Sequence, residues 1–495
     1  MTKKVIIPNR GVIALDIIDS MKGIGLETIL LHSPEDSKSL GVKLADQSYK
    51  FYSSRLQDSY LDMEAIIEKA LEVKADYVHP GYGFLSESPE FSQLCQDNNI
   101  QFIGPDPKTM RTVGDKIHLR KIAERLGIRV MPYSSPIKSP ITLDALPTDS
   151  KFPMLVKPLC GFGGKGIRLV EYKKNAQERI NNMLKSESNQ KQGVFLEEYF
   201  PYAHHIEIPF FRDTRGNILF PPEIESSIQR RFQKIFQESP SPNINADQRR
   251  SLYHDAQKIL QEIHYIGMGY IEFIVEKGVS YFSELNPSLQ INTLIPEVHM
   301  TSNFLKKQFA VINGEPLHHV EGVKIIEPRH HVLLVSLMAE NPFDNFQPSS
   351  GTVTEFYNYS SIRNIFKTNL FTGAEISPLY DPFIGKILTF SSRRDHSLTS
   401  MRNFLNNIII RGIKTNLPFL RSFLQNEALA RGETIIDFLN LKYNYAKQRK
   451  SEEDICKATA LLAAAFHLEN KQKNFKARLE TMKQPGFFKR LFNRL

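Results

Sequence analysis

The stretch that decides the fold runs from residue 269 to residue 293 and reads Gly269-Tyr-Ile-Glu272-Phe-Ile-Val-Glu-Lys-Gly278-Val-Ser-Tyr-Phe-Ser-Glu284-Leu-Asn286-Pro-Ser288-Leu-Gln290-Ile-Asn292-Thr293. Its pattern predicts two strands, Tyr270–Val275 and Ser280–Leu285, which flank a Lys-Gly turn. In an antiparallel pair of this length, Glu272 and Glu284 come side by side on one face, with Asn286 one pleat further along. The stretch therefore predicts a hairpin that carries two carboxylates and an amide together.

These three side chains could serve as metal ligands. Carboxylate and amide oxygens are hard ligands, and Mg²⁺ takes such a set while leaving positions open for the phosphates of a nucleotide. The alternative is a solvated hairpin edge, on which charged residues are common. The hairpin alone does not decide between the two, so a phosphate-binding segment must be sought elsewhere in the chain.

A candidate phosphate-binding segment lies upstream, in Pro153-Met-Leu-Val-Lys157-Pro-Leu-Cys160-Gly161-Phe-Gly163-Gly164-Lys165-Gly166. An apolar strand ends in Lys157, and the loop after it has glycines whose backbone N–H groups can wrap phosphate oxygens without side-chain clash. The next segment has the pattern of a strand rather than a helix, which excludes the Walker A and dinucleotide-binding motifs. A plain hairpin is the alternative for this loop alone. Together with the carboxylate hairpin, the loop indicates the ATP-grasp arrangement, in which two α+β lobes hold ATP between them.

The composition is that of a globular protein with several domains. The chain has 495 residues, 41% of them hydrophobic and 24% charged, and it has no apolar run of the ~18 residues that a membrane span requires. A strand pattern begins directly after the first residues, so we expect no signal or transit peptide, and three widely spaced cysteines fit a reducing, cytoplasmic setting. The net charge of +9 suggests polyanionic partners. Because no nucleic-acid-binding motif is present, we attribute this charge to phosphate binding and a basic tail.

The first hundred residues alternate between strand and helix patterns. Strands are predicted at Lys4–Ile7, Glu27–His32 and Tyr77–His79, and helices at Gly11–Lys22 and Met63–Leu71. Such an alternation is typical of βαβ units, in which the strands form a parallel sheet. We therefore expect an α/β fold with a doubly wound, Rossmann-like N-terminal domain that precedes the ATP-grasp unit.

Four segments resemble the biotin carboxylase family. They are Ile7-Pro-Asn9-Arg10-Gly11-Val-Ile-Ala, Ala45-Asp46, His79-Pro-Gly-Tyr-Gly-Phe-Leu-Ser-Glu87 and Phe102-Ile-Gly104-Pro105. A generic nucleotide-binding fold does not readily produce the nine-residue match that begins at His79. The resemblance spans residues 3–443 and implies an enzyme that carboxylates biotin with MgATP and bicarbonate.

The resemblance also implies roles for individual residues. It places nucleotide contacts at Lys116, Lys157, Gly163, Gly164, Glu197, His205 and Gln229, and Mg²⁺ ligands at Glu272, Glu284 and Asn286. Lys116 and Lys157 would contact phosphates, and Glu197 with the backbone after it would receive the adenine. His205 would lie near the ribose. Lys234 falls on a family lysine associated with bicarbonate, which Gln290 would help to hold.

The agreement fails at the positions that carry the carboxylation chemistry. Ser288 stands where the family has a bicarbonate-binding arginine, Asn292 where it has the glutamate that acts as the base, and Ser336 where it has the arginine that steadies the biotin enolate. An asparagine cannot accept a proton at neutral pH, and the loss of a positioned base typically costs about 10²–10⁴ in rate. We expect a MgATP-binding subunit of an acyl-CoA or pyruvate carboxylase in which carboxylation is weak or lost.

Two other functions are compatible with the same sequence. One is a non-catalytic nucleotide-binding paralogue with a structural or regulatory role in a carboxylase complex, and the other is an ATP-grasp ligase for another acid. Family membership favours the enzyme, whereas the three replacements favour the paralogue. In a carboxylase complex we expect a homodimer or hetero-complex, whose other components would include a biotin carrier protein or a carboxyltransferase.

The predicted domain organisation follows the family. It comprises an N-terminal domain at 1–104, a linker at 105–132, a mobile, glycine-rich ATP-grasp lid at 133–203, the ATP-grasp core with the C-terminal biotin carboxylase domain at 204–443, and a basic helical tail at 444–495. Within the tail, residues 450–483 have the pattern of a polar helix with one apolar face. Met482-Lys483 lacks the flanking residues of a biotin attachment site, so biotin would arrive on another chain.

Overall fold

The protein is described by a computed structural model that covers residues 2–142, 146, 151–159, 166–186, 189, 192–443, 461, 462 and 467. Most of the predicted phosphate loop, including Gly163 and Gly164, and the predicted tail helix apart from three residues lie outside the described residues. Met1–Lys442 forms one compact unit and Tyr443–Leu495 a second. Every predicted site residue belongs to the first unit.

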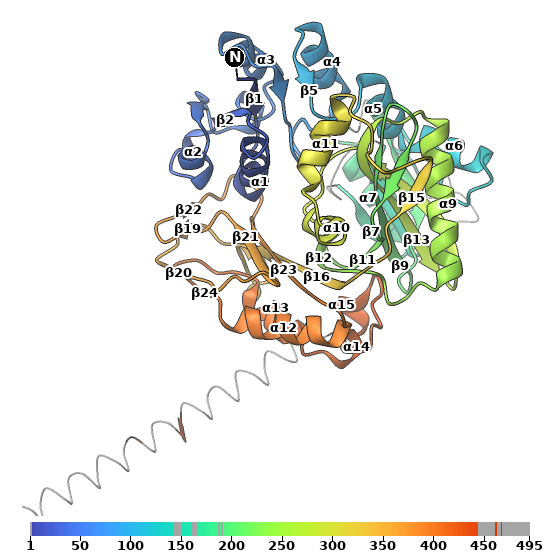
Figure 1. Ribbon diagram of the computed structural model, residues 1–495. Helices are drawn as coiled ribbons and strands as arrows, with labels where there is room; N and C mark the ends of the chain where they lie inside the picture. The colour runs from blue at the N-terminus through green and yellow to red at the C-terminus, as the bar shows by residue number, and fades with distance from the viewer. Residues whose placement is uncertain are drawn as a thin grey trace, which may run out of the picture. The chain divides into compact units, whose positions relative to one another are not determined.

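The N-terminal part folds around a five-stranded parallel sheet with the strand order β3-β2-β1-β4-β5 (Figure 1). Its elements are β1 Lys4–Ile7, α1 Gly11–Lys22, β2 Glu27–His32, α2 Leu40–Leu44, β3 Gln47–Lys50, α3 Met63–Glu72, β4 Tyr77–Val78, α4 Pro89–Asp97 and β5 Gln101–Phe102. Both faces of the sheet are covered, because Val5 packs in one apolar cluster with α1 and Ile6 in another with α3 and α4. The predicted doubly wound domain is confirmed.

A linker of two helices leads to the lid. The helices are α5 Pro107–Gly114 and α6 Lys116–Arg125. The carboxylate of Asp115 caps α6 by accepting the N–H groups of Ile117 and His118, which fixes Lys116 at the first helical position. The lid is an antiparallel sheet of order β7-β6-β8, formed by β6 Met154–Pro158, β7 Arg168–Val170 and β8 Val194–Glu198, with α7 Lys173–Met183 packed on it. The strand predicted after the glycine loop is confirmed as β7.

A ten-stranded sheet forms the centre of the first unit (Figure 1). Its main path is β14-β13-β9-β11-β12-β16-β23-β21, and β10 and β15 extend it beside β9. The strands are β9 His204–Arg212, β10 Ile218–Phe220, β11 Ile224–Arg230, β12 Gln233–Ser239, β13 Gly267–Glu276, β14 Val279–Asn286, β15 Val323–Ile325, β16 His331–Met338, β21 Asn364–Thr368 and β23 Phe383–Ser391. The predicted hairpin is confirmed as β13 and β14. β13 begins earlier than predicted because its pairing with β9 starts at Gly267.

Helices cover this sheet and short ribbons complete the C-terminal part. The helices are α9 Ala246–Glu262, α10 Leu294–Met300, α11 Phe304–Ile312, α12 Arg394–Asn406, α13 Leu417–Phe423, α14 Glu427–Ala430 and α15 Phe438–Leu441. α9 contacts β9, whereas α12 packs on β16 and β23. Three two-stranded ribbons pair β17 Glu340–Asn341 with β18 Gln347–Pro348, β19 Gly351–Thr352 with β22 Glu375–Ile376, and β20 Glu355–Tyr357 with β24 Ile409–Arg411.

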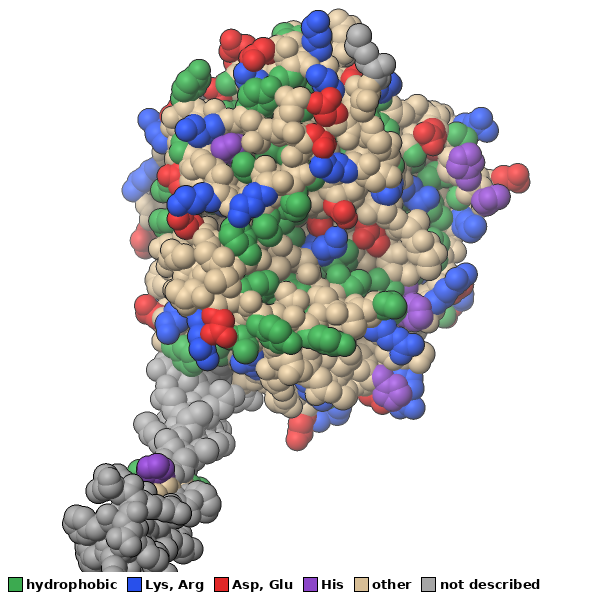
Figure 2. Space-filling model, turned by 60° about the vertical axis from the view of Figure 1, so that its left-hand side comes forward, with side chains coloured by type: hydrophobic (Ala, Val, Ile, Leu, Met, Phe, Trp, Pro, Cys, Tyr) green, Lys and Arg blue, Asp and Glu red, His purple; other side chains and the backbone are tan. Residues whose placement is uncertain are grey.

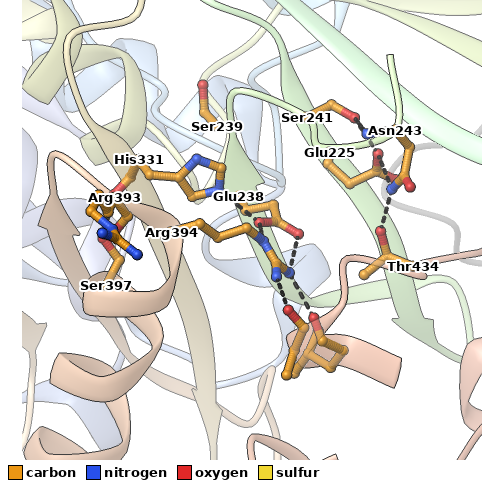
Figure 3. Close-up of polar contacts among 12 residues, drawn as sticks. Glu225, Glu238, Ser239, Ser241, Asn243, His331, Arg393, Arg394, Ser397 and Thr434 are labelled. Carbon is orange, nitrogen blue, oxygen red and sulfur yellow. Dashed lines mark hydrogen bonds and ion pairs between the residues drawn. The ribbon is translucent and has the colours of Figure 1, made fainter. Parts of the chain in front are cut away.

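A buried carboxylate fastens the C-terminal helices to the sheet (Figure 3). Glu238 of β12 accepts hydrogen bonds from His331 Nε2 at 2.9 Å and from Arg394 Nε at 2.7 Å. Arg394 also donates to the carbonyl oxygens of Leu429 and Ala430, the last two residues of α14. Burial alone would raise the pKa of Glu238, but His331 and Arg394 hold it below its usual range. Removing one partner of such a buried pair typically costs about 3–5 kcal/mol, so this network fixes α12 and α14 against β12.

The surface of the first unit is mixed in charge where Figure 2 shows it. On that face, lysine and arginine side chains are dispersed among acidic ones and form no continuous basic field. This differs from the basic stripe that an electrostatic nucleic-acid footprint requires. Within the part of the chain that the structure describes, no helix has both the length and the apolar character for crossing a bilayer.

Candidate functional site

Three carboxylates lie in register across the β9-β13-β14 edge of the central sheet. Glu272 of β13 pairs with Glu284 of β14 on one side and with Glu207 of β9 on the other. Residues directly opposite each other on neighbouring strands point to the same face, so the three side chains form one row. Asn286 belongs to this face as well, because its Nδ2 lies 2.8 Å from Glu272 Oε1. The predicted placement of Glu272 beside Glu284 is confirmed, whereas Glu207 is not among the predicted site residues.

Lysines from outside the three strands neutralise this carboxylate row. Lys234 Nζ of β12 lies 2.8 Å from Glu207 and 2.7 Å from Glu272, and Lys116 Nζ lies 3.3 Å from Glu284. Burial alone would raise the pKa of Glu272, yet Lys234 holds it far below its usual range. Burial would likewise lower the pKa of Lys234, but its two carboxylate partners raise it. The two lysines thus hold the pKa values of Glu272 and Glu284 below their usual range, so both hairpin carboxylates are ionised at neutral pH.

A histidine connects the carboxylate row to β11. His205 Nε2 lies 2.6 Å from Glu272 Oε2, and its Nδ1 lies 2.7 Å from Nε2 of Gln229. Since the Gln229 amide can only donate to Nδ1, a neutral His205 carries its proton on Nε2 and directs it at Glu272. The structure thus brings together two predicted nucleotide contacts and one predicted metal ligand.

The donor set suits a hard divalent cation. Glu272, Glu284 and Asn286 present oxygen ligands from one face of the hairpin, as Mg²⁺ prefers. Among the described residues there is no group of three or more His, Cys, Asp and Glu side chains that could hold a metal ion alone. Phosphate oxygens and water would have to complete the coordination shell, which is the usual state of Mg²⁺ at nucleotide sites.

The predicted phosphate lysine and adenine-side glutamate lie on one face of the lid. Lys157 of β6 pairs with Phe195 of β8, and Glu197 lies two residues further along β8, which makes Lys157 and Glu197 diagonal neighbours. Lys157 Nζ lies 2.5 Å from Glu197 Oε1, and both side chains are buried. The loop glycines Gly163 and Gly164 lie outside the described residues. In this structure, Lys157 therefore contacts Glu197.

An arginine that the sequence reasoning missed completes this cluster. Arg120 of α6 is 1% exposed and donates a hydrogen bond to Glu197. Burial alone would raise the pKa of Glu197, but Lys157 and Arg120 hold it below its usual range. A sequence signal for Arg120 exists, because it lies three residues from both Ile117 and Ala123 and therefore on the apolar face of α6. A charged residue on such a face needs a buried counter-ion.

The three positions at which the resemblance predicts replaced carboxylation residues are buried and uncharged. Ser288 Oγ donates to Glu87 Oε1 at 2.5 Å, and Asn292 Nδ2 donates to Glu207 Oε2 at 3.1 Å. Ser336 of β16 is fully buried, and its hydroxyl has no hydrogen-bond partner within the described part of the chain. Ser288 and Asn292 are thus hydrogen-bond donors to carboxylates. An arginine or an amide can donate in this way, whereas a glutamate can do so only when it is protonated.

Glu87 is a further residue of the site for which the sequence predicted no role. Burial raises the pKa of Glu87 to about 7, although the hydrogen bond from Ser288 opposes the shift. Glu87 ends the motif that begins at His79, so its position was visible in the sequence but its partner was not. Gln290, the predicted bicarbonate contact between Ser288 and Asn292, is buried.

Family models match almost the whole of the first unit. The biotin carboxylase N-terminal domain matches residues 1–110, the ATP-binding domain of the carbamoyl-phosphate synthase L chain matches 115–320, and the biotin carboxylase C-terminal domain matches 335–441. The three matches follow one another in the order of the N-terminal sheet, the lid with the carboxylate row, and the strands from β16 onward.

Curated relatives and solved structures match over nearly the same length. The biotin carboxylase of Haemophilus influenzae is 33% identical over 89% of this chain and 99% of its own, and biotin carboxylase 1 of Bacillus subtilis is 31% identical over 89% and 98%. A crystal structure of a biotin carboxylase–β-γ-ATP complex from Campylobacter jejuni superimposes with a TM-score of 0.83 at 30% identity, covering 89% of this chain and 98% of that one. The biotin carboxylase domain dimer of the Hydrogenobacter thermophilus 2-oxoglutarate carboxylase, in complex with MgADP, ADP and bicarbonate, gives 0.83 at 29% identity over 90% and 99%. This chain belongs to the biotin carboxylase family.

Proposed function

We propose that this chain is the MgATP-binding, biotin carboxylase-like subunit of an acyl-CoA or pyruvate carboxylase, and that its own carboxylation of biotin is weak or lost. The observation that carries this proposal is a contrast between neighbouring groups of the same site. Glu272 and Glu284 keep their carboxylates and their lysine partners, whereas Ser288, Asn292 and Ser336 are buried and uncharged.

The part of the site that comprises Lys116, Lys157, Glu197, Glu272, Glu284 and Asn286, here called the nucleotide half, has the groups that a triphosphate and its metal need. Lys116 and Lys157 would neutralise phosphate charge, and Glu272, Glu284 and Asn286 would hold Mg²⁺. A bound Mg²⁺ would supply positive charge at the phosphoryl oxygens. The complexes of the similar chains with ATP and MgADP support this assignment.

The bicarbonate half has neither the cation nor the base that the resemblance implies at positions 288 and 292. Bicarbonate must lose a proton and be held by positive charge before it can attack a phosphoryl group. Lys234 is already engaged by Glu207 and Glu272, and Asn292 offers an amide in place of a carboxylate. Each lost charge-assisted contact removes roughly 1.5–3 kcal/mol of binding. Carboxyphosphate should therefore form very slowly.

The second candidate is a non-catalytic, nucleotide-binding subunit with a structural or regulatory role. It is favoured by the way in which two replacements are accommodated, since Ser288 and Asn292 each donate to a buried carboxylate. Such contacts give the two carboxylates a hydrogen-bond donor without contributing to chemistry, although Asn292 Oδ1 itself has no hydrogen-bond partner among the described residues. A ligase for another acid would require a cation for that acid, which the neutral side chains at 288, 292 and 336 do not provide.

The partners that we propose are those of the wider complex. Biotin would be carried by a separate chain, and a carboxyltransferase subunit would use the product. Self-association as a homodimer is a further proposal, supported by the dimer named for the Hydrogenobacter thermophilus domain. We also propose a cytoplasmic location, in which the buried free thiol of Cys95 would stay reduced.

An ATP turnover assay tests the proposed function. We expect the protein to be stabilised by MgATP or MgADP in a thermal-shift titration, and its ATP cleavage to be unaffected by bicarbonate and free biotin. Absence of any nucleotide shift would contradict the binding half of the proposal. Carboxylation of free biotin at a rate typical of enzymes, of the order of 1 s⁻¹ or faster, would contradict the other half.

A further inference from the structure

The ammonium group of Lys157 has two possible partners, a nucleotide phosphate and the carboxylate of Glu197. To bind a nucleotide phosphate, its ammonium group must be available, yet Nζ lies 2.5 Å from Glu197 Oε1 in this structure. Both side chains are buried, with Lys157 at 7% and Glu197 at 2% exposure. A phosphate and Glu197 therefore compete for the same cation.

Moving Lys157 toward a phosphate would be costly if it were the sole partner of Glu197. A buried carboxylate that loses its counter-ion has neither water nor a cation to compensate its charge. The lost pairing would be subtracted from the gain at the phosphate, and nucleotide affinity would fall. The competition is relieved only by a second cation that stays with Glu197.

Arg120 has the geometry of that second cation. Its Nη2 donates to Glu197 Oε2, the carboxylate oxygen that Lys157 leaves free, and also to the carbonyl of Ser283 at 3.3 Å. The guanidinium is 1% exposed and lies over the rings of Phe195, at 4.9 Å, and Tyr133, at 5.3 Å. A planar guanidinium stacked on two rings has little freedom to leave.

Arg120 also has hydrogen-bond donors that no acceptor among the described residues uses. Its Nε and Nη1 nitrogens are buried and have no hydrogen-bond partner within the described part of the chain. When Lys157 leaves Glu197 Oε1, one of these N–H groups could take that oxygen and complete a two-pronged arginine–carboxylate pair, which is the strongest geometry for such a pair. The negative charge of Glu197 would then remain compensated.

We propose that Arg120 is the positioning residue that releases Lys157 to the nucleotide phosphates, by serving as the permanent counter-ion of Glu197. This inference rests on the proposed binding of MgATP and adds how the phosphate lysine is freed. Arg120 acts through Lys157, so its effect grows with the phosphates of the ligand and is absent for a ligand that has none.

The test compares MgATP with adenosine as ligands of the full chain. Arg120→Met removes the cation and keeps an unbranched apolar side chain against the two rings. We expect its affinity for MgATP to fall at least about tenfold, while its affinity for adenosine stays within about twofold of the parent. The matched control is Arg125→Met on the same helix, whose side chain is 66% exposed, and it should leave both affinities unchanged.

A second variant separates this role from a general loss of structure. In Arg120→Met with Glu197→Gln, no charged carboxylate remains to hold Lys157. Loss of the predicted adenine contact would weaken MgATP and adenosine alike, so the ratio of the two affinities should return to near the parent value. If this ratio in the double variant stays as low as in the single one, or if adenosine binding falls together with MgATP binding in Arg120→Met, Arg120 contacts the nucleotide or supports the fold and the inference is wrong. Equal MgATP affinity in the parent and in Arg120→Met would also overturn it while leaving the proposed function intact. A parent protein that binds no MgATP would overturn the proposed function and this inference with it.

Discussion

The nucleotide half and the bicarbonate half of the candidate site differ in the charge of their buried polar side chains. In the nucleotide half, Glu197 and Glu272 are buried anions, and each is held by two or more donors or cations. In the bicarbonate half, the three positions at which the resemblance predicts lost charge are Ser288, Asn292 and Ser336, all buried and all neutral. Both halves belong to the same compact unit, so the difference in charge comes from the side chains and not from the backbone fold.

This difference shows which side-chain replacements leave the remaining buried charges paired. Removing every partner of a buried carboxylate in the nucleotide half would leave an unpaired buried charge, which is strongly destabilising. In the bicarbonate half, neutral side chains stand at all three positions, and Asn292 still satisfies Glu207 by donating its amide N–H. At two of the three positions, neutral side chains therefore give the neighbouring carboxylates Glu87 and Glu207 a hydrogen-bond donor.

The strongest response should come from restoring charge to the bicarbonate half. Ser288→Arg combined with Asn292→Glu should raise bicarbonate-dependent ATP cleavage by about 10²-fold or more, because it supplies a cation and a base. The new carboxylate at 292 would face Glu207, whose Oε2 is 3.1 Å from the present amide nitrogen, so the two carboxylates would repel each other and the gain would be partly offset. Release of phosphate with and without bicarbonate measures the effect.

Each single variant serves as a control for this gain. Neither alone should approach the double variant, since one lacks the base and the other lacks the cation. Carboxylation of free biotin should in addition require Ser336→Arg. A double variant that turns over no faster than the parent would show that the neutral residues are not what limits the reaction.

The second effect concerns the nucleotide half. Lys157→Ala should weaken MgATP binding by about 10²-fold, since charge-assisted contacts are worth roughly 1.5–3 kcal/mol each and a tenfold change corresponds to ~1.4 kcal/mol. Arg120 would still compensate Glu197, so the fold should survive. Isothermal titration with MgATP measures the loss. The exposed Lys173→Ala, on helix α7 of the lid, should bind like the parent, and an unaltered affinity in Lys157→Ala would remove Lys157 from the phosphate site.

A third effect tests the acid that faces Ser288. Burial raises the pKa of Glu87 to about 7 from the usual 4.5, so between these pH values the folded state binds a proton that the unfolded state has released. The stability of the parent should therefore fall as the pH rises from about 4.5 to about 7, by an amount of the order of 2–3 kcal/mol. Glu87→Gln should remove this fall.

Urea unfolding at pH 5 and pH 8 measures the Glu87 contribution. The stability of Glu87→Gln relative to the parent should increase between the two pH values, whereas Glu90→Gln, the same change at an exposed position of α4, should show no such increase. Ser288→Arg should also flatten the profile, because a guanidinium beside Glu87 would lower the pKa of that carboxyl. Parallel profiles for parent and Glu87→Gln would mean that Glu87 is ionised in the folded protein.

Truncation after Lys442 should disturb stability least of all. Residues Met1–Lys442 form a compact unit of their own, so their melting temperature should change little. We expect the truncated chain to lose capture of a biotin carrier or carboxyltransferase component, because we propose that the alternating apolar and basic residues at the end of the tail dock on a partner. A marked fall in melting temperature would show instead that the tail is part of the core.

Local features of this protein could be predicted from the order of its residues. The bounds of α1, the first two strands and the pairing of Glu272 with Glu284 follow from apolar periodicity and a turn of fixed length, which act over a few residues. The replacement of charged groups at 288, 292 and 336 was also visible, because it needs only the family pattern for comparison. The roles assigned to the site residues stay predictions until the binding experiments are done.

The pairing of the buried charges, in contrast, depends on the packing of distant elements. Arg120 meets Glu197 across 77 residues of sequence, Asn292 meets Glu207 across 85, and Ser288 meets Glu87 across 201. No periodicity connects positions so far apart, since each contact depends on how the helices, the lid and the central sheet pack together. A charge pattern indicates that a buried ion needs a partner, but the fold alone selects which one.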